Sequence, residues 1–301
     1  MNRIKSILSL LLGIFMLFSC QEKSSKKAEL RKSILSQIDE IQGDIAVAFY
    51  NLDDASDSLL INAEEEFHAA STMKVPVMIE LYKQENEGIL DLNDSILLKN
   101  EFKSIVDGSP YSMDIVDDSD DVIYSKIGTV VAIKDLIYSM ITVSSNLATN
   151  VLIELVDAKK VTATMRTLGA EKIEVLRGVE DQKAFDLGLS NSTTARDLMM
   201  IMKAIAENTA GTKDDCEEMI GIMKDQQFNE IIPFYLPKDV SVAHKTGSIT
   251  GVHHDAGIIY LPDGRAYVLV LLSKNLKDFD KGTEQLAGIS KTIYDYIIKT
   301  D

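Results

Sequence analysis

Apolar residues spaced three or four positions apart predict helices at both ends of the chain and through its middle. The first helix is predicted over residues 28–41, with Gly43 as a stop signal, and the last over about residues 283–298. Six segments between them have the same spacing: residues 71–87, 131–143, 146–156, 161–168, 194–206 and 215–226. The chain therefore has a long helical middle.

Short apolar runs near both ends of the chain predict strands. They cover residues 44–50, 58–62, 240–245, 256–261 and 266–273, and Pro262-Asp263-Gly264 between the last two is a strong hairpin signal. Strands at both ends and helices between them predict an α+β fold, with terminal helices packed on one antiparallel sheet. We expect a sheet lobe from about residues 28–70 and 228–301, and a helical lobe from about residues 71–227. A site is expected in the cleft between them.

The composition limits the classes of function. The 301 residues are 46% hydrophobic and 26% charged, which is typical of a globular protein, and the formal net charge is −16. Such an acidic surface argues against sequence-independent binding of nucleic acid, because that binding needs Lys and Arg on phosphates. The chain has no Walker loop, no Gly-x-Gly-x-x-Gly and no Cys-x-x-Cys, and its two cysteines, Cys20 and Cys216, exclude a disulfide framework.

The first twenty residues have the pattern of an export signal. Arg3 and Lys5 precede an apolar run over residues 7–18 that is short for a membrane span. Leu17-Phe18-Ser19-Cys20 resembles a bacterial lipobox, so we expect cleavage before Cys20 and its lipidation; the alternative is an ordinary signal peptide with an incidental cysteine. Polar residues 21–27 would form a tether, and residues 28–301 the folded domain. We expect an exported lipoprotein of the periplasm or cell envelope, held at a membrane through this lipid only.

The first candidate for chemistry is Ser71-Thr72-Met73-Lys74, at the start of a predicted helix. Residues three apart share a helix face, so the Lys74 amine can reach the Ser71 hydroxyl. A lysine whose pKa is lowered can take the proton of a serine nucleophile, and the amides at a helix N-terminus suit an oxyanion. The alternative is that Ser71 is only a helix N-cap.

Two further motifs follow in the chain. Ser144-Ser145-Asn146 lies between predicted helices, where a hydroxyl and an amide can project into a cleft; its alternative is a helix cap. Lys245-Thr246-Gly247 ends a predicted strand and offers a cation and a hydroxyl for a substrate carboxylate. Gly247 leaves room for a close ligand, although it could also be a β-bulge glycine.

In this order the three motifs resemble those of the penicillin-recognising serine enzymes, class A β-lactamases in particular. The resemblance covers nearly all of residues 28–301 and implies the β-lactamase/transpeptidase-like fold, with a five-stranded antiparallel sheet. It implies Ser71 as the acylated nucleophile, Lys74 as its proton acceptor and Ser144 as a relay to the leaving nitrogen. The substrate would be held by Asn146, Asn150, Lys245, Thr246, Gly247 and Ser248, with the backbone amides of Ser71 and Ser248 as the oxyanion hole.

The family clears its acyl-enzyme with a water that a loop glutamate activates, and Glu180 is the candidate here. Arg177 and the pair Thr193-Thr194 match the flanks of that loop. The spacing from Arg to Glu is one residue longer than in the family, Ala184 replaces the usual Asn, and Asn191 stands where the family has a loop-closing Asp. Asp181 is the alternative base.

A second departure concerns the substrate carboxylate. The position aligned with the family's additional Arg is Ala256, and the neighbouring His253 and His254 could substitute as donors. We expect no metal site at His253 and His254, because adjacent residues on a strand point to opposite faces and chelate a metal poorly. We also expect no organic cofactor.

The resulting hypothesis is a monomeric serine β-lactamase that hydrolyses the β-lactam amide through a Ser71 acyl-enzyme and binds no nucleic acid. One alternative is a penicillin-binding D-alanyl-D-alanine peptidase or esterase with slow deacylation, which would act on peptides of that type. The other is a catalytically silent lipoprotein that binds peptidoglycan in the same cleft.

Overall fold

The structure is a computed structural model that describes residues 25–299. The predicted signal segment with Cys20 and residues 21–24 lie outside the described residues. Residues 25–27, predicted as part of the tether, already belong to the first helix, which covers residues 25–38. Within residues 25–299 no helix is long and apolar enough to cross a membrane.

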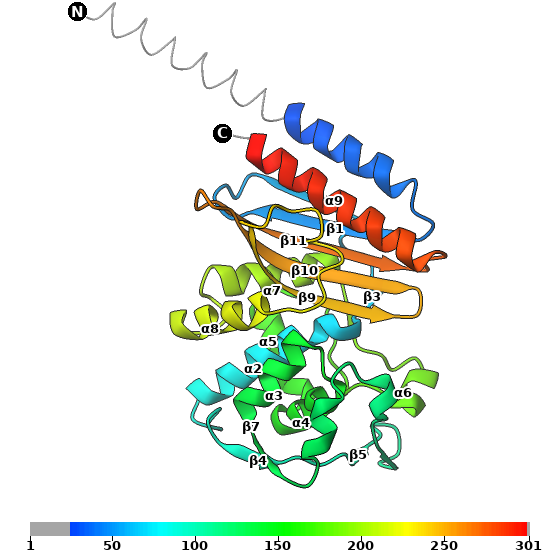
Figure 1. Cartoon of the computed structure of the whole chain (residues 1–301), viewed down its shortest axis with the longest axis vertical. Helices are drawn as coiled ribbons and strands as arrows, with labels where there is room; N and C mark the ends of the chain where they lie inside the picture. Colours follow the sequence, from blue (N-terminus) through cyan, green and yellow to red (C-terminus); the bar gives the residue numbers. More distant parts are fainter. Residues whose placement is uncertain (1–24, 300–301) are drawn as a thin grey trace, which may run out of the picture.

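Five antiparallel strands form the central sheet, and the predicted α+β class with terminal helices is confirmed (Figure 1). The strand order is β2 (Ser58–Ile61), β1 (Asp44–Asn51), β11 (Ala266–Lys274), β10 (Val252–Tyr260) and β9 (Ser241–Ile249). The first helix and α9 (Phe279–Lys299) cover one face of this sheet. Their apolar residues, such as Ile34 and Ile293, form a buried cluster with Val47 and Leu269 from the strands.

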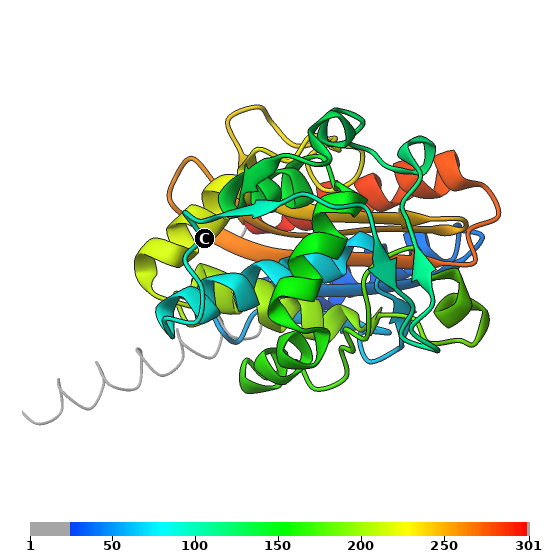
Figure 2. The ribbon, with the colours of Figure 1, turned by 90° about the horizontal axis from the view of Figure 1, so that it is seen from below.

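The opposite face of the sheet packs on the remaining helices, because strand side chains alternate between the two faces. Ala46 and Ala48 of β1 point to this side and belong to the larger hydrophobic cluster. Against it lie α7 (Ala195–Ala206) and α8 (Lys213–Lys224). In the view from below, the helical part of the chain lies in front of the strands (Figure 2).

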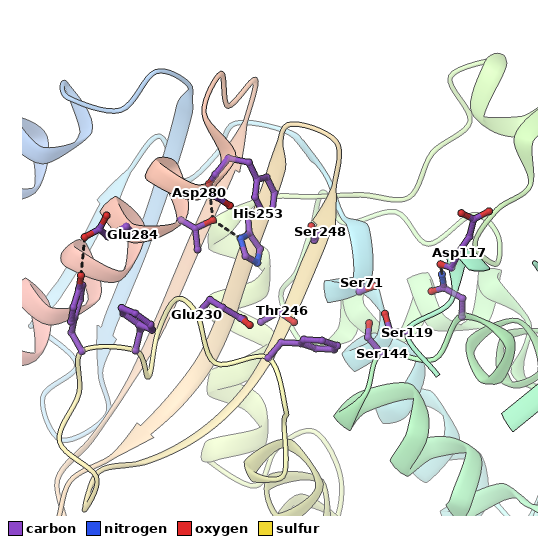
Figure 3. A pocket seen from close by; sticks show the side chains of 16 residues that line it. Ser71, Asp117, Ser119, Ser144, Glu230, Thr246, Ser248, His253, Asp280 and Glu284 are labelled. Carbon is purple, nitrogen blue, oxygen red and sulfur yellow. Dashed lines mark hydrogen bonds between the residues drawn. The ribbon is translucent and has the colours of Figure 1, made fainter. Parts of the chain in front are cut away.

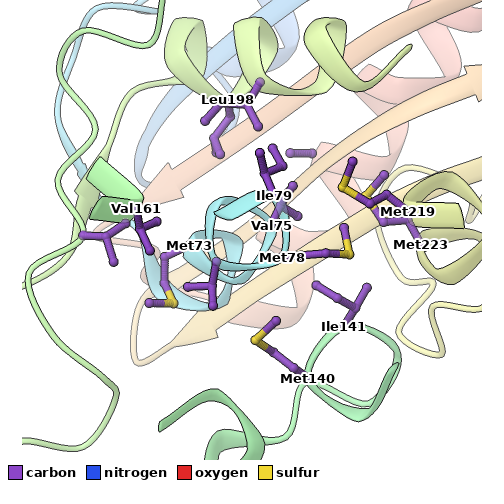
Figure 4. Packing of buried hydrophobic residues seen from close by; sticks show 14 of the residues in the cluster. Met73, Val75, Met78, Ile79, Met140, Ile141, Val161, Leu198, Met219 and Met223 are labelled. Atoms are coloured by element: carbon purple, nitrogen blue, oxygen red, sulfur yellow. The ribbon is translucent and has the colours of Figure 1, made fainter. Parts of the chain in front are cut away.

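The helix α2 (Lys74–Asn86) is the centre of the helical part. It contacts α3 (Ile133–Thr142), α4 (Asn146–Val156) and α5 (Ala158–Thr167), and its residues Val75 and Ile79 are fully buried. Figure 4 shows apolar side chains from several elements around it. The turn that precedes α2 packs against β9 and β10 of the sheet.

Several short elements were not predicted. Two-residue and three-residue strands form three small ladders: β3 (Phe67–His68) with β8 (Ser192–Thr193), β4 (Ser95–Leu97) with β7 (Val130–Ala132), and β5 (Phe102–Lys103) with β6 (Pro110–Tyr111). Other short elements are the 3-10 turns η2 (Ile115–Asp117) and η3 (Val122–Lys126) and the helix α6 (Gln182–Asp186).

Candidate active site

Ser71 lies in a 3-10 turn, η1 (Ala70–Met73), that leads directly into α2. The predicted helix over residues 71–87 therefore begins as a tighter turn. The backbone amide of Ala70 donates to Nδ1 of His68 (3.0 Å), and that of Ala69 donates to the carbonyl of Asn191 (2.8 Å). These bonds tie the turn to β3 and to the residue before β8, and Ser71 lines the cavity between sheet and helices.

The backbone is strained at three positions of the site. Seven described residues other than glycine have a positive φ, and four of them are Asn or Asp, which tolerate this region. The other three are Ala70 (φ 45°), Ser144 (φ 58°) and Glu180 (φ 61°). Such strain persists where the surroundings enforce it and concentrates at functional sites.

Lys74 is fully buried and donates to three oxygen atoms of the second motif. Its Nζ lies 2.7 Å from the carbonyl oxygen of Ser144, 3.1 Å from the Ser144 hydroxyl and 2.9 Å from Oδ1 of Asn146. Burial lowers its pKa to about 7, although the carboxylates of Asp118 and Glu180 oppose this shift. The neutral amine, which can accept a proton, is therefore accessible near neutral pH.

Ser144 also contacts the third motif. Lys245, fully buried on β9, donates from Nζ to the Ser144 hydroxyl (3.0 Å) and to the carbonyl of Thr246 (2.9 Å). The pKa of Lys245 lies well below its usual range. Burial is the main cause, and the like charge of Lys74 is the second. The Ser144 hydroxyl thus lies between two buried amines, and the three motifs of the sequence meet in one place.

Gly247 packs directly against the turn of Ser71. A Cβ at this position would lie 3.0 Å from the Ser71 nitrogen and 3.1 Å from the Thr72 nitrogen. Only glycine allows the strand to approach this closely.

Glu180 reaches the site through Asn146. The Asn146 side chain accepts from Lys74 at Oδ1 and donates from Nδ2 to Oε1 of Glu180 (2.8 Å), so one amide links the two titratable groups. Burial raises the pKa of Glu180 to about 6, and the charges of Asp118 and Asp117 act in the same direction.

The loop that carries Glu180 is held from behind by Asn150. Oδ1 of Asn150 accepts from the Val179 amide (2.6 Å), and Nδ2 donates to the Val179 carbonyl (3.0 Å). A side chain at Gly178 would overlap Asn150. Asn150 is fully buried and does not line the cavity of Ser71, so the expectation that it contacts substrate does not fit its position. Its bonds support the loop instead.

The same loop is closed by Asn191, which occupies the position of the loop-closing Asp of the family. Its Oδ1 accepts from the amides of Leu176 (2.8 Å) and Arg177 (3.2 Å), and its Nδ2 donates to the Arg177 carbonyl (2.9 Å). A neutral amide therefore closes the loop. Asp181, the alternative base, accepts from Ser104, Ile105 and Ala184, so three donors occupy its carboxylate.

Asp118 was not recognised in the sequence as part of the site. Its carboxylate accepts from the backbone amides of Asn146 (2.9 Å) and Leu147 (2.8 Å), which caps α4. Its charge also raises the pKa of Lys74 and of Glu180. Asp118 is one of five aspartates within residues 114–121, and nothing in the sequence distinguishes it from the other four.

The register of β9 and β10 decides which side chains face the helical part. Lys245 pairs with Ala256, so both lie on the face that packs on the helices, where Ala256 is fully buried. A side chain at position 256 would therefore point into the protein and could not donate a hydrogen bond to the substrate carboxylate. His254 also faces this side; its ring accepts from the Ser273 amide (3.1 Å) and donates to the His68 carbonyl (2.9 Å). Burial lowers the pKa of His254 to about 4.

Of the two histidines considered as donors, only His253 lines the cavity of Ser71. It pairs with Ser248 across the ladder, so the two side chains share a face. Figure 3 shows His253 beside Ser248 and Thr246 on the strands, opposite Ser71 and Ser144.

Two hollows meet at Ser71 and together form a groove. The larger, about 680 Å³, extends over Thr246 toward α9, and we call it the α9 arm. The smaller, about 410 Å³, extends over Thr250 toward Glu180, and we call it the loop arm. Four residues line both: Ser71, Asp117, Asn146 and Ser248. Among residues 25–299 no group of three His, Cys, Asp or Glu side chains is arranged to hold a metal ion.

A serine beside buried lysines, under an antiparallel sheet with terminal helices, defines a serine hydrolase of the class A β-lactamase type. The model of the β-lactamase enzyme family matches residues 27–297, and the chain belongs to this family. It is 24% identical to the extended-spectrum β-lactamase PER-1 of Pseudomonas aeruginosa, over 98% of this chain and 96% of that protein.

Solved structures agree in fold. The extended-spectrum β-lactamase TLA-1 superposes with a TM-score of 0.78 at 20% identity, over 91% of this chain and 99% of that one. PBP-A superposes with a TM-score of 0.77 at 25% identity, over 90% and 96% of the two chains.

Proposed function

We propose that this protein is a serine β-lactamase in which Ser71 is acylated and then released by water. The observation that carries the proposal is the continuous set of contacts from Lys245 through Ser144, Lys74 and Asn146 to Glu180. A proton acceptor, a proton relay and a second base are therefore joined in one network, and Ser144 and Asn146 of this network line the same cavity as Ser71. Neither a metal nor an organic cofactor enters these steps.

In the acylation step, the Ser71 hydroxyl oxygen attacks the β-lactam carbonyl and gives its proton to neutral Lys74. The negative charge on the carbonyl oxygen is stabilised by backbone amides of Ser71 and Ser248. The C–N bond of the ring then breaks, and Ser144 passes a proton from the lysines to the leaving nitrogen. Thr246 lines the cavity and binds the substrate carboxylate, and Lys245 supports this contact from behind through its bonds to Ser144 and Thr246.

In the deacylation step, Glu180 takes a proton from a water that attacks the ester carbonyl. The ester C–O bond breaks, and Ser71 recovers its proton. A pKa near 6 suits this role, because the group is ionised at neutral pH and still basic enough to accept a proton.

The test is hydrolysis of a chromogenic cephalosporin by the purified protein, followed by mass spectrometry of Ser71. We expect turnover that Ser71→Ala abolishes and that Ser33→Ala, a change on the exposed face of the first helix, leaves intact. Turnover retained in Ser71→Ala would refute the proposal. A penicilloyl adduct that persists for minutes would indicate a penicillin-binding peptidase or esterase, and binding of cell-wall peptide without any adduct would indicate a silent binding protein.

We further propose that the protein is an exported, monomeric lipoprotein of the cell envelope, anchored through Cys20, that confers resistance to β-lactams. The lipobox-like sequence Leu17-Phe18-Ser19-Cys20 and the polar residues after it support this proposal. Labelling with a fatty-acid analogue in bacteria should mark the protein and fail in Cys20→Ser. Labelling that survives this change would refute the anchor.

A further inference from the structure

The α9 arm of the groove is acidic. Glu230, Asp280 and Glu284 line it, Asp117 lies where it meets the loop arm, and no Lys or Arg is among its lining residues. Within residues 25–299 neither Glu230, Asp280 nor Glu284 forms a salt bridge, although Glu284 accepts a hydrogen bond from the Tyr235 hydroxyl (3.1 Å). Lys281, the nearest cation along α9, does not line the arm but lines a neighbouring hollow that shares Tyr235 and Glu284 with it. The arm therefore has an excess of negative charge, and Glu230 and Asp280 carry the part of it that lies away from Lys281.

A buried hydrogen-bond acceptor faces the same arm. His253 is only 7% exposed, and its Nδ1 lies 2.8 Å from the Thr283 hydroxyl, which itself donates to the Phe279 carbonyl. Nδ1 must therefore carry the hydrogen, which leaves Nε2 of the neutral ring as an acceptor. Burial lowers the pKa of His253 and favours this neutral form. No described residue donates to Nε2, so a ligand donor can occupy it (Figure 3).

The chemistry of cephalosporins determines which substituent enters this arm. This step rests on the proposed function, in which Ser71 and Ser248 fix the position of the β-lactam carbonyl and Thr246 fixes that of the carboxylate. The ring carbon that bears the 3-substituent is bonded to the carbon that bears the carboxylate, so this substituent extends from Thr246 into the α9 arm. The acylamino chain on the opposite side of the β-lactam ring extends along Asn146 into the loop arm.

We propose that the α9 arm selects β-lactams that carry a cationic substituent next to the carboxylate, with Glu230 and Asp280 as charge partners and His253 as hydrogen-bond acceptor. Aromatic rings strengthen this preference. Phe234 and Tyr235 line the arm, are 55% and 41% exposed, and lie edge to face with ring centroids 4.7 Å apart. Exposed ring faces attract cations.

The test compares three cephalosporins with one common acylamino side chain. Their 3-substituents are neutral acetoxymethyl, cationic pyridiniummethyl without an N–H, and aminomethyl, which is a protonated ammonium with N–H donors. We expect the native protein to favour the cationic compounds in kcat/KM, and the double variant Glu230→Gln/Asp280→Asn to reduce this preference about five- to tenfold. Raising the salt to 1 M should reduce it in the native protein as well.

Two controls separate charge in the arm from other effects. Glu101→Gln makes half the charge change of the double variant at an exposed carboxylate that does not line the groove, and it should keep the native preference. Comparing variants with one set of compounds cancels differences in their intrinsic reactivity. His253→Phe should reduce the rate with the ammonium compound more than with pyridinium, because only the ammonium donates a hydrogen bond.

The outcomes are distinguishable. A preference for the cationic compounds that is unchanged in the double variant would overturn the proposal, and so would equal kcat/KM for all three compounds in the native protein. Hydrolysis of none of the compounds, without an adduct on Ser71, would instead refute the proposed function.

Discussion

Gly247→Ala tests whether the close approach of β9 positions the nucleophile. The added methyl carbon would lie 3.0 Å from the Ser71 nitrogen and 3.2 Å from Cβ of Ala70, whereas ordinary contacts begin at 3.4 Å. Both neighbours belong to a backbone turn that other bonds hold in place, so the strand and the turn must separate by a few tenths of an ångström. This displacement falls on the Ser71 amide, one of the two proposed oxyanion donors.

We expect Gly247→Ala to lower the rate of acylation about 100-fold, because loss of one oxyanion donor typically costs about 10²–10³ in rate. Overpacking of this kind also destabilises a fold by about 1–3 kcal/mol, which for a chain of this size lowers the Tm by several degrees. Stopped-flow measurement with a chromogenic cephalosporin gives the acylation rate, and thermal unfolding gives the Tm.

The matched control is Gly221→Ala in α8. A Cβ there meets nothing within 4 Å, and Ala in place of Gly in a helix stabilises by about 0.5–1 kcal/mol. We expect native acylation and an equal or higher Tm. Acylation by Gly247→Ala within threefold of the native rate would show that this contact does not position Ser71.

Three further predictions follow from the groups around the nucleophile. Lys74→Ala should abolish acylation in a folded protein, and kcat/KM of the native protein should fall as the pH drops below about 7, where Lys74 becomes protonated; acylation of the variant at the native rate would contradict its role as proton acceptor. Glu180→Gln should accumulate the acyl-enzyme, visible by mass, and its Tm at pH 8 should not fall, because burial already disfavours the charged carboxylate; unchanged turnover would assign deacylation to another group. Asn150→Ala removes both bonds to the Val179 backbone and should slow deacylation more than acylation in burst kinetics; an equal effect on both steps would mean that the loop does not depend on Asn150.

The strands of the sheet were predicted well where their buried side chains are apolar, and less well where their buried side chains are polar. The predicted strand over residues 266–273 agrees with β11, which is almost wholly apolar. In contrast, β10 begins at Val252, four residues before the predicted start at 256, because His253, His254 and Asp255 interrupt the hydrophobic pattern. These side chains are nevertheless buried, since each has a hydrogen-bond partner on α9, β3 or β9.

The motifs of the site could be found in the sequence because they are local, whereas their supports are not. Ser71 and Lys74 are three residues apart, and a helix pattern is enough to predict that they share a face. Asn150 and Val179 are 29 residues apart, and the bond from Asn146 to Asp118 spans 28. No spacing rule predicts such contacts, so Asn150 was assigned to the substrate and Asp118 was not assigned at all.

The three strained residues explain why the local pattern is least informative at the site itself. Ala favours helical conformations, yet Ala70 adopts φ 45° directly before the nucleophile. The bond from its amide to His68 enforces this conformation, and His68 is in turn held through its carbonyl by buried His254. Local preference is overruled here by contacts from β3 and β10, and a conflict between local preference and the fold is itself a mark of a functional position. The same reasoning applies to Ser144 and Glu180, each of which presents its side chain to the site from a left-handed backbone.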